Sequence, residues 1–156
     1  MRDSRCPLCK LAAREQALQN SLDRRVECER CGTFDISGDI PLMEIEEFTD
    51  PNGNRVRDRV HVLSGLTRQE SDVGRRILIA PDNIISLLES VSVPKTPLEN
   101  MERALLYLSS RQRRADDEPH VFYDKEYPLV FVRDGKEFHY IMDCLVDRGY
   151  LHERSR

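Results

Sequence analysis

Cys6-Pro7-Leu8-Cys9 and Cys28-Glu29-Arg30-Cys31 are two Cys-x-x-Cys pairs near the start of the chain. Two residues between paired cysteines allow both thiolates to bind one ion, and two such pairs complete a tetrahedral shell of four sulfurs. Soft thiolate ligands favour zinc over the other common divalent metals. Because the protein fills all four positions, none is left for a water or a substrate. We therefore expect one structural Zn²⁺ per chain, bound by Cys6, Cys9, Cys28 and Cys31.

The same cysteines have two other interpretations. A thioredoxin-like redox motif is a single Cys-x-x-Cys in a βαβ unit, whereas this segment holds two pairs and is too short for such a unit. Two disulfides would need an oxidising compartment. The start of the chain is charged and lacks the apolar segment of a signal peptide, so we expect a reducing, cytoplasmic location.

The composition limits the classes of partner. Of the 156 residues, 39% are hydrophobic and 33% are charged, which is typical of a globular chain with a well-solvated surface. No apolar run approaches the roughly 20 residues of a membrane-spanning helix, so we expect no membrane partner. The formal net charge is −4, so the molecule as a whole does not attract nucleic acid. Any such binding requires a local basic patch.

The pattern predicts an α+β protein with two domains. Residues 1–38 form a zinc ribbon, in which a hairpin over about residues 11–27 joins the two cysteine pairs and a short strand follows at 33–36. Residues 39–156 form a mainly helical, winged-helix-like domain, with a linker near residues 91–96. So small a ribbon buries too little apolar surface to fold alone, and metal binding would supply the missing stability.

Helical spacing and capping signals organise the second domain. They predict one helix that begins near Asp39, two that run over 55–66 and 83–90, and one that begins at the capping box Thr96-Pro97-Leu98-Glu99. β-branched and aromatic residues predict β segments at 77–80, 120–123 and 127–132. Asp134-Gly135 fits either a hairpin turn or the start of a helix that ends at Gly149. The capping-box spacing of Asp134 and Glu137 and the apolar spacing after them favour the helix.

A helix, a β segment, a second helix and then Arg148-Gly149-Tyr150-Leu151 follow the order of a winged-helix domain up to the start of its wing. The helix that would enter the major groove carries Lys136 against three acidic residues, Glu137, Asp143 and Asp147. Phosphates would repel it. We therefore expect a protein–protein or dimerisation role for this domain.

Eight arginines are candidates for contact with nucleic acid or with an acidic partner: Arg55, Arg57, Arg59, Arg75, Arg76, Arg111, Arg113 and Arg114. Such arginines are also typical of a solvated helix face or of the negative end of a helix dipole. The chain contains no glycine-rich phosphate loop, Gly-x-Ser-x-Gly elbow or His-Glu-x-x-His helix, and its histidines are scattered singly. We expect no catalysis by this chain.

Several short sequences together resemble a known arrangement: the two cysteine pairs, Phe34-Asp35-Ile36-Ser37-Gly38, Leu63-Ser64-Gly65-Leu66-Thr67-Arg68, Glu126-Tyr127-Pro128-Leu129 and Arg148-Gly149-Tyr150-Leu151. The chain resembles the zinc-ribbon plus winged-helix-like region at the front of multidomain bacterial proteins, among them anti-phage defence proteins with a TIR effector domain. The resemblance implies a recognition or oligomerisation region, and nothing here matches the catalytic glutamate of a TIR domain. The alternatives are a DNA-binding winged-helix regulator and a fragment of an enzyme.

Overall fold

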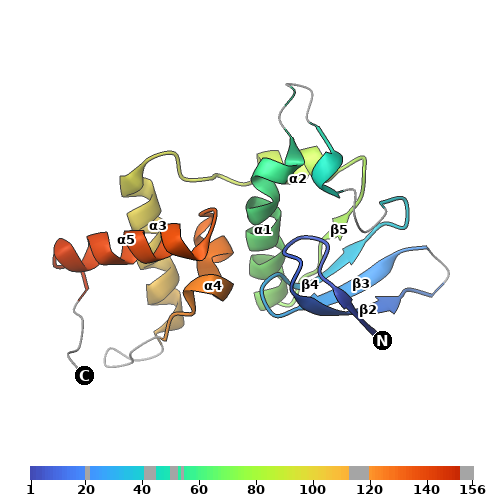
Figure 1. Ribbon diagram of the computed structural model, residues 1–156, viewed down its shortest axis with the longest axis horizontal. Helices are drawn as coiled ribbons and strands as arrows, with labels where there is room; N and C mark the ends of the chain where they lie inside the picture. Colours follow the sequence, from blue (N-terminus) through green and yellow to red (C-terminus); the bar gives the residue numbers. More distant parts are fainter. Residues whose placement is uncertain (20–21, 41–44, 50–52, 54, 113–119, 152–156) are drawn as a thin grey trace. The chain divides into compact units, whose positions relative to one another are not determined.

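The computed structural model describes residues 1–19, 22–40, 45–49, 53, 55–112 and 120–151. The chain combines a sheet with several helices, as the predicted α+β class requires (Figure 1). It divides into two compact units, Met1–Ser92 and Val93–Arg156. This division differs from the predicted boundary after residue 38. It lies inside the stretch 91–96, and residues 39–92 belong to the same unit as the four cysteines.

In its described residues, the first unit contains one five-stranded sheet with its strands in chain order: β1 (Arg2–Arg5), β2 (Ala12–Ala17), β3 (Arg24–Cys28), β4 (Gly32–Ile36) and β5 (Leu78–Ile79). The first four strands pair antiparallel, whereas β5 pairs parallel to β4. The predicted hairpin is the β2–β3 pair, and the predicted strand at 33–36 is β4.

One face of this sheet forms the core of the first unit. Val26 pairs directly with Phe34, and Ile36 pairs with Ile79; all four side chains are fully buried. Complete burial of a side chain of this size contributes roughly 1.5–3 kcal/mol relative to its exposure. The helix α1 (Val60–Asp72) packs against β4 and adds the buried Leu63 to this core.

The remaining elements of the first unit are short. Part of the helix predicted from Asp39 lies in residues 41–44, outside the described residues; the described part is a 3₁₀ turn, η1 (Ile45–Glu47). The helix predicted over 55–66 is a 3₁₀ turn, η2 (Val56–Arg59), followed by α1. The helix predicted over 83–90 is α2 (Ile84–Ser90).

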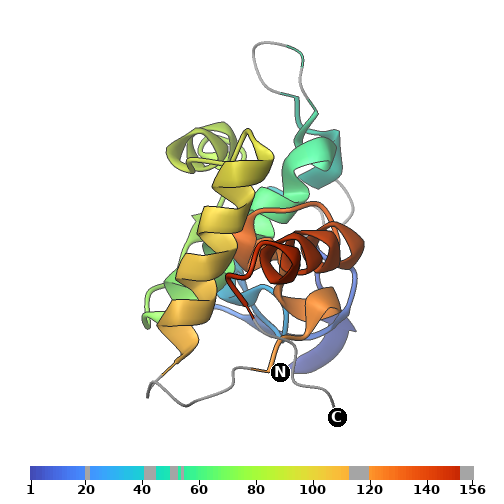
Figure 2. The same cartoon turned by 90° about the vertical axis from the view of Figure 1, so that its left-hand side faces the viewer.

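The second unit is helical in its described residues: α3 (Pro97–Arg111), α4 (Tyr123–Glu126), η3 (Tyr127–Val130) and α5 (Gly135–Asp147). Helix α5 lies across α3, as both views of the cartoon show (Figures 1 and 2). The core between these elements contains Met101 and Leu108 of α3, Val130, and Phe138 and Leu145 of α5.

The β segments predicted at 120–123 and 127–132 are wrong: Tyr123 begins the helical turn α4, and 127–130 form η3. Pro128 explains the second error, because proline cannot donate to a strand ladder but fits the first turn of a helix. Short helical turns bury the apolar side chains as well as a strand would, with Val130 fully inside the core. Because the described part of this unit contains no strand, the winged-helix arrangement is not confirmed.

Both capping boxes of the second unit are present. Thr96 Oγ1 accepts a hydrogen bond from the Glu99 amide at 3.2 Å, and Glu99 Oε2 accepts one from the Lys95 amide at 2.6 Å. Asp134 Oδ1 accepts one from the Glu137 amide at 2.9 Å, so the segment after Asp134 is a helix and not the second strand of a hairpin. No helix among the described residues is long and apolar enough to cross a membrane.

Candidate metal centre

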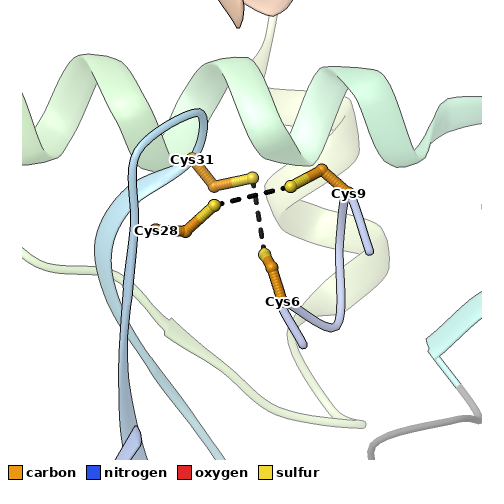
Figure 3. A group of neighbouring side chains, drawn as sticks. All are labelled: Cys6, Cys9, Cys28 and Cys31. Atoms are coloured by element: carbon orange, nitrogen blue, oxygen red, sulfur yellow. Dashed lines mark hydrogen bonds between the residues drawn. The ribbon is translucent and has the colours of Figure 1, made fainter. Parts of the chain in front are cut away.

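The four predicted ligand cysteines lie together. Cys6 and Cys9 come from the turn between β1 and β2, Cys28 ends β3, and Cys31 lies in the turn before β4. Their sulfur atoms all lie within 4.8 Å of one another, and Figure 3 shows the side chains converging on a common centre. The Sγ atoms of Cys6 and Cys31 are 3.6 Å apart, and those of Cys9 and Cys28 are 3.4 Å apart.

These distances fit a metal ion and exclude disulfides. Zinc–sulfur bonds of about 2.3 Å in a tetrahedron place neighbouring sulfurs about 3.8 Å apart. A disulfide requires about 2.05 Å between sulfurs, and the cysteines of the cluster are free thiols. The donor set, four thiol sulfurs without a carboxylate or an imidazole, is that of a closed structural site.

Local backbone geometry sets the direction of each cysteine pair. Each pair lies in a tight turn, called a knuckle: residues 6–10 form the first knuckle and residues 28–32 the second. In the first knuckle, the Cys6 amide donates to the Leu11 carbonyl at 2.8 Å, and the Lys10 amide donates to the Cys6 carbonyl at 2.9 Å. Lys10 itself has φ of 60°, a left-handed conformation that bends the chain back toward β2. In the second knuckle, Gly32 has φ of 73° and fills the corresponding role without a steric penalty.

Burial and mutual hydrogen bonding shape the electrostatics of the sulfurs. Cys6 and Cys31 are fully buried, whereas Cys9 is partly exposed. Hydrogen bonds from Cys31, Cys6 and Cys9 hold the pKa of the Cys28 thiol well below its ordinary value. The hydrogen bond to Cys28 raises the pKa of Cys6 and that of Cys31. A divalent cation at the centre of the cluster would stabilise the thiolate form of all four cysteines.

Helix α1 covers the second knuckle, and Figure 3 shows it passing over the cysteines. Ser64 Oγ lies 3.0 Å from Cys31 Sγ, in a buried contact. Ser71 Oγ accepts a hydrogen bond from the Thr33 amide at 2.9 Å, and Arg68 donates to the Glu29 carbonyl. Sequence analysis gave these three residues no role at the cysteines. Their spacing of four and three residues places them on one face of α1, but the helix predicted over 55–66 ended before Arg68 and Ser71.

The candidate arginines are divided between the two units: Arg111 belongs to the second unit, and most of those described in the first unit have internal partners. The backbone of Arg55 pairs with that of Thr49 in an isolated antiparallel β-bridge. Arg113 and Arg114 lie outside the described residues. The remaining contacts are Arg57 Nε to Glu46 Oε2 at 3.4 Å, Arg59 Nη2 to the Leu88 carbonyl at 2.7 Å, Arg75 Nη2 to Glu70 Oε1 at 2.9 Å, Arg76 Nε to Asp35 Oδ2 at 3.9 Å, and Arg111 to the Tyr107 hydroxyl at 2.7 Å and to Glu126.

A histidine–aspartate pair lies on α5. His139 Nδ1 lies 3.0 Å from Asp143 Oδ2, as the spacing of four residues allows. The Tyr123 ring packs against the His139 ring with centroids 4.7 Å apart. The side chains of His139 and Asp143 are 55% and 53% exposed. Pairs of this kind are common on helix surfaces, and this geometry does not identify a reaction.

Comparison with known proteins finds no relative: no family model matches the chain, and neither a curated protein nor a solved structure matches it. The resemblance to the front regions of bacterial defence proteins therefore stays a prediction from short motifs. The cysteine cluster and the contacts around it are the observations on which a function has to be based.

Proposed function

We propose that this chain is a non-catalytic module, stabilised by one structural zinc ion, that acts in recognition, assembly or regulation through a protein partner or a second copy of itself. The observation that carries the proposal is the closed set of four sulfurs, three of them on buried cysteines, with Ser64 of α1 in contact with Cys31. A closed set leaves no position for a substrate, so the ion would hold the fold together. We propose a cytoplasmic location, where the thiols stay reduced.

The internal use of the arginines supports a protein partner over nucleic acid. A protein that binds DNA through phosphates needs cations that are free to replace counterions. Here Arg57, Arg75 and Arg76 pair with carboxylates of the same unit. The exposed face of α5 carries Asp143 and Asp147, which would repel phosphates. A DNA-binding winged-helix regulator is therefore the weaker alternative.

The helical second unit is consistent with the same role. Its two long helices, α3 and α5, correspond to the helices of the predicted winged-helix-like body. The short helical turns α4 and η3 occupy the place of the expected strand. Together with the resemblance described above, this supports a module that stands ahead of an effector domain in a bacterial defence protein.

The test combines metal analysis with measurement of assembly. We expect one zinc per chain in reduced, freshly purified protein, and a defined oligomer or a stable complex in size-exclusion chromatography with light scattering. Protein without stoichiometric metal would refute the zinc site. A monomer that retains no partner from its own host would refute the assembly role. A shift of duplex DNA that weakens steeply with salt would favour the regulator instead.

A further inference from the structure

The buried contact between Ser64 of α1 and Cys31 of the second knuckle assigns Ser64 a role at the metal centre. We infer that Ser64 is a positioning residue that donates its hydroxyl proton to the Cys31 thiolate and couples metal binding to the docking of α1. The two atoms are 3.0 Å apart. Cys31 is fully buried and Ser64 is 1% exposed, so water does not compete for either group. This inference rests on the zinc site proposed above.

The direction of the hydrogen bond follows from the chemistry of the pair. A metal-bound thiolate has no proton and can only accept, whereas a serine hydroxyl can donate. Serine inside a helix commonly donates to a carbonyl of the preceding turn. The neighbouring Thr67 behaves in this way, with its Oγ1 donating to the Ser64 carbonyl at 3.1 Å. The Ser64 hydroxyl is directed instead to the sulfur.

The other sulfur contacts come from within the ribbon. The thiol of Cys9 has a backbone hydrogen bond with Leu11, and that of Cys28 has one with Cys31. The backbone groups of these hydrogen bonds lie in the knuckles or directly beside them, so the bonds do not depend on α1. Ser64 is 33 residues from Cys31 in the chain, so its contact forms only when α1 docks. Loss of the ion would weaken that docking, and loss of the hydroxyl would weaken binding of the ion.

Ser71 provides a matched comparison on the same helix. It also contacts the second knuckle, but its Oγ accepts from the Thr33 amide and does not contact sulfur. If the hydroxyls of α1 only hold the helix in place, removal of either one should affect the metal equally. If Ser64 acts on the thiolate, only its removal should change the electronic properties of the ion.

The experiment uses the full chain with Co²⁺ as a spectroscopic probe and Zn²⁺ for affinity. For Ser64→Ala we expect a shifted thiolate-to-cobalt charge-transfer band and zinc affinity about 10-fold lower or more in competition with a chelator, as is typical for loss of an outer-sphere partner. For Ser71→Ala we expect the band of the unmodified chain. Ser64→Thr and Ser64→Val introduce side chains of nearly equal size, of which only threonine keeps the hydroxyl. We expect the charge-transfer band of the unmodified chain in Ser64→Thr and a shifted band in Ser64→Val. This pair tests the hydroxyl even if Ser64→Ala fails to fold.

The outcomes separate this inference from the zinc site itself. The same band in Ser64→Thr and Ser64→Val, or equal loss of affinity in Ser64→Ala and Ser71→Ala, would overturn the role of Ser64 and leave the four-cysteine site intact. Failure of the unmodified chain to bind Co²⁺ tetrahedrally would overturn the proposed function.

Discussion

Gly32 lies against Ser71 of α1 so closely that a Cβ atom on residue 32 would stand 2.5 Å from the Ser71 Cβ. The same glycine has φ of 73°, in the left-handed region. Both constraints arise because the chain must turn sharply after Cys31 while α1 packs over the turn. Residue 32 therefore connects the geometry of the cysteine pair with the position of the helix.

Replacement of Gly32 tests this packing. We expect Gly32→Ala to lower the free energy of unfolding by about 1–2 kcal/mol from the left-handed backbone alone, with a further loss from the clash with Ser71. The matched control is Gly74→Ala, because Gly74 has φ of 76° and an added Cβ there meets nothing within 4 Å. Denaturant unfolding compares the two variants. Equal losses at both positions would show that α1 yields to the extra atom.

Removal of the metal should affect one unit and not the other. Metal binding in small zinc domains contributes on the order of 10 kcal/mol or more, and all four cysteines belong to the unit Met1–Ser92. After treatment with a chelator, we expect hydrogen exchange to accelerate in β3, β4 and α1 and to stay unchanged in α3 and α5. Added Zn²⁺ should restore the protection. Unchanged exchange in β3 and β4 would contradict a structural role for the ion.

Replacement of single cysteines should distinguish those that bind zinc from the one that does not. Cys28→Ala removes one of the four clustered sulfurs, and we expect it to abolish stoichiometric zinc and to lower the unfolding temperature. Cys144 is the control: it lies on α5, in the second unit, and belongs to a different core. Cys144→Ala should keep one zinc per chain in elemental analysis. If Cys28→Ala also keeps it, Cys28 is not a ligand.

The features that sequence reasoning predicted are those with local causes. The cysteine pairs bring their ligands together across two residues, and the capping boxes at Thr96 and Asp134 close hydrogen bonds over three. The β2–β3 hairpin joins neighbouring strands. In each case the partners are close in the chain, so the pattern alone identifies the contact.

The features that were missed depend on contacts distant in the chain. The hydroxyl of Ser64 meets Cys31 only because α1 returns over the sheet, and the parallel pairing of Ile79 with Ile36 needs the same return. Between 120 and 132, β-branched and aromatic residues suit a strand as well as a buried helical turn. The core between α3 and α5 decided between them, and Pro128 favours the turn.

The N-cap of α5 can be tested apart from the metal. Asp134 Oδ1 accepts from the Glu137 amide at 2.9 Å, while Glu137 Oε2 accepts from the Arg133 amide at 2.8 Å. We expect Asp134→Ala to lower the free energy of unfolding of the second unit by about 1 kcal/mol, because a helix amide loses its acceptor. Asp134→Asn keeps an acceptor oxygen and should lose less. Hydrogen exchange at the first turn of α5 is the measurement, and equal protection in both variants would mean that the carboxylate does not cap the helix.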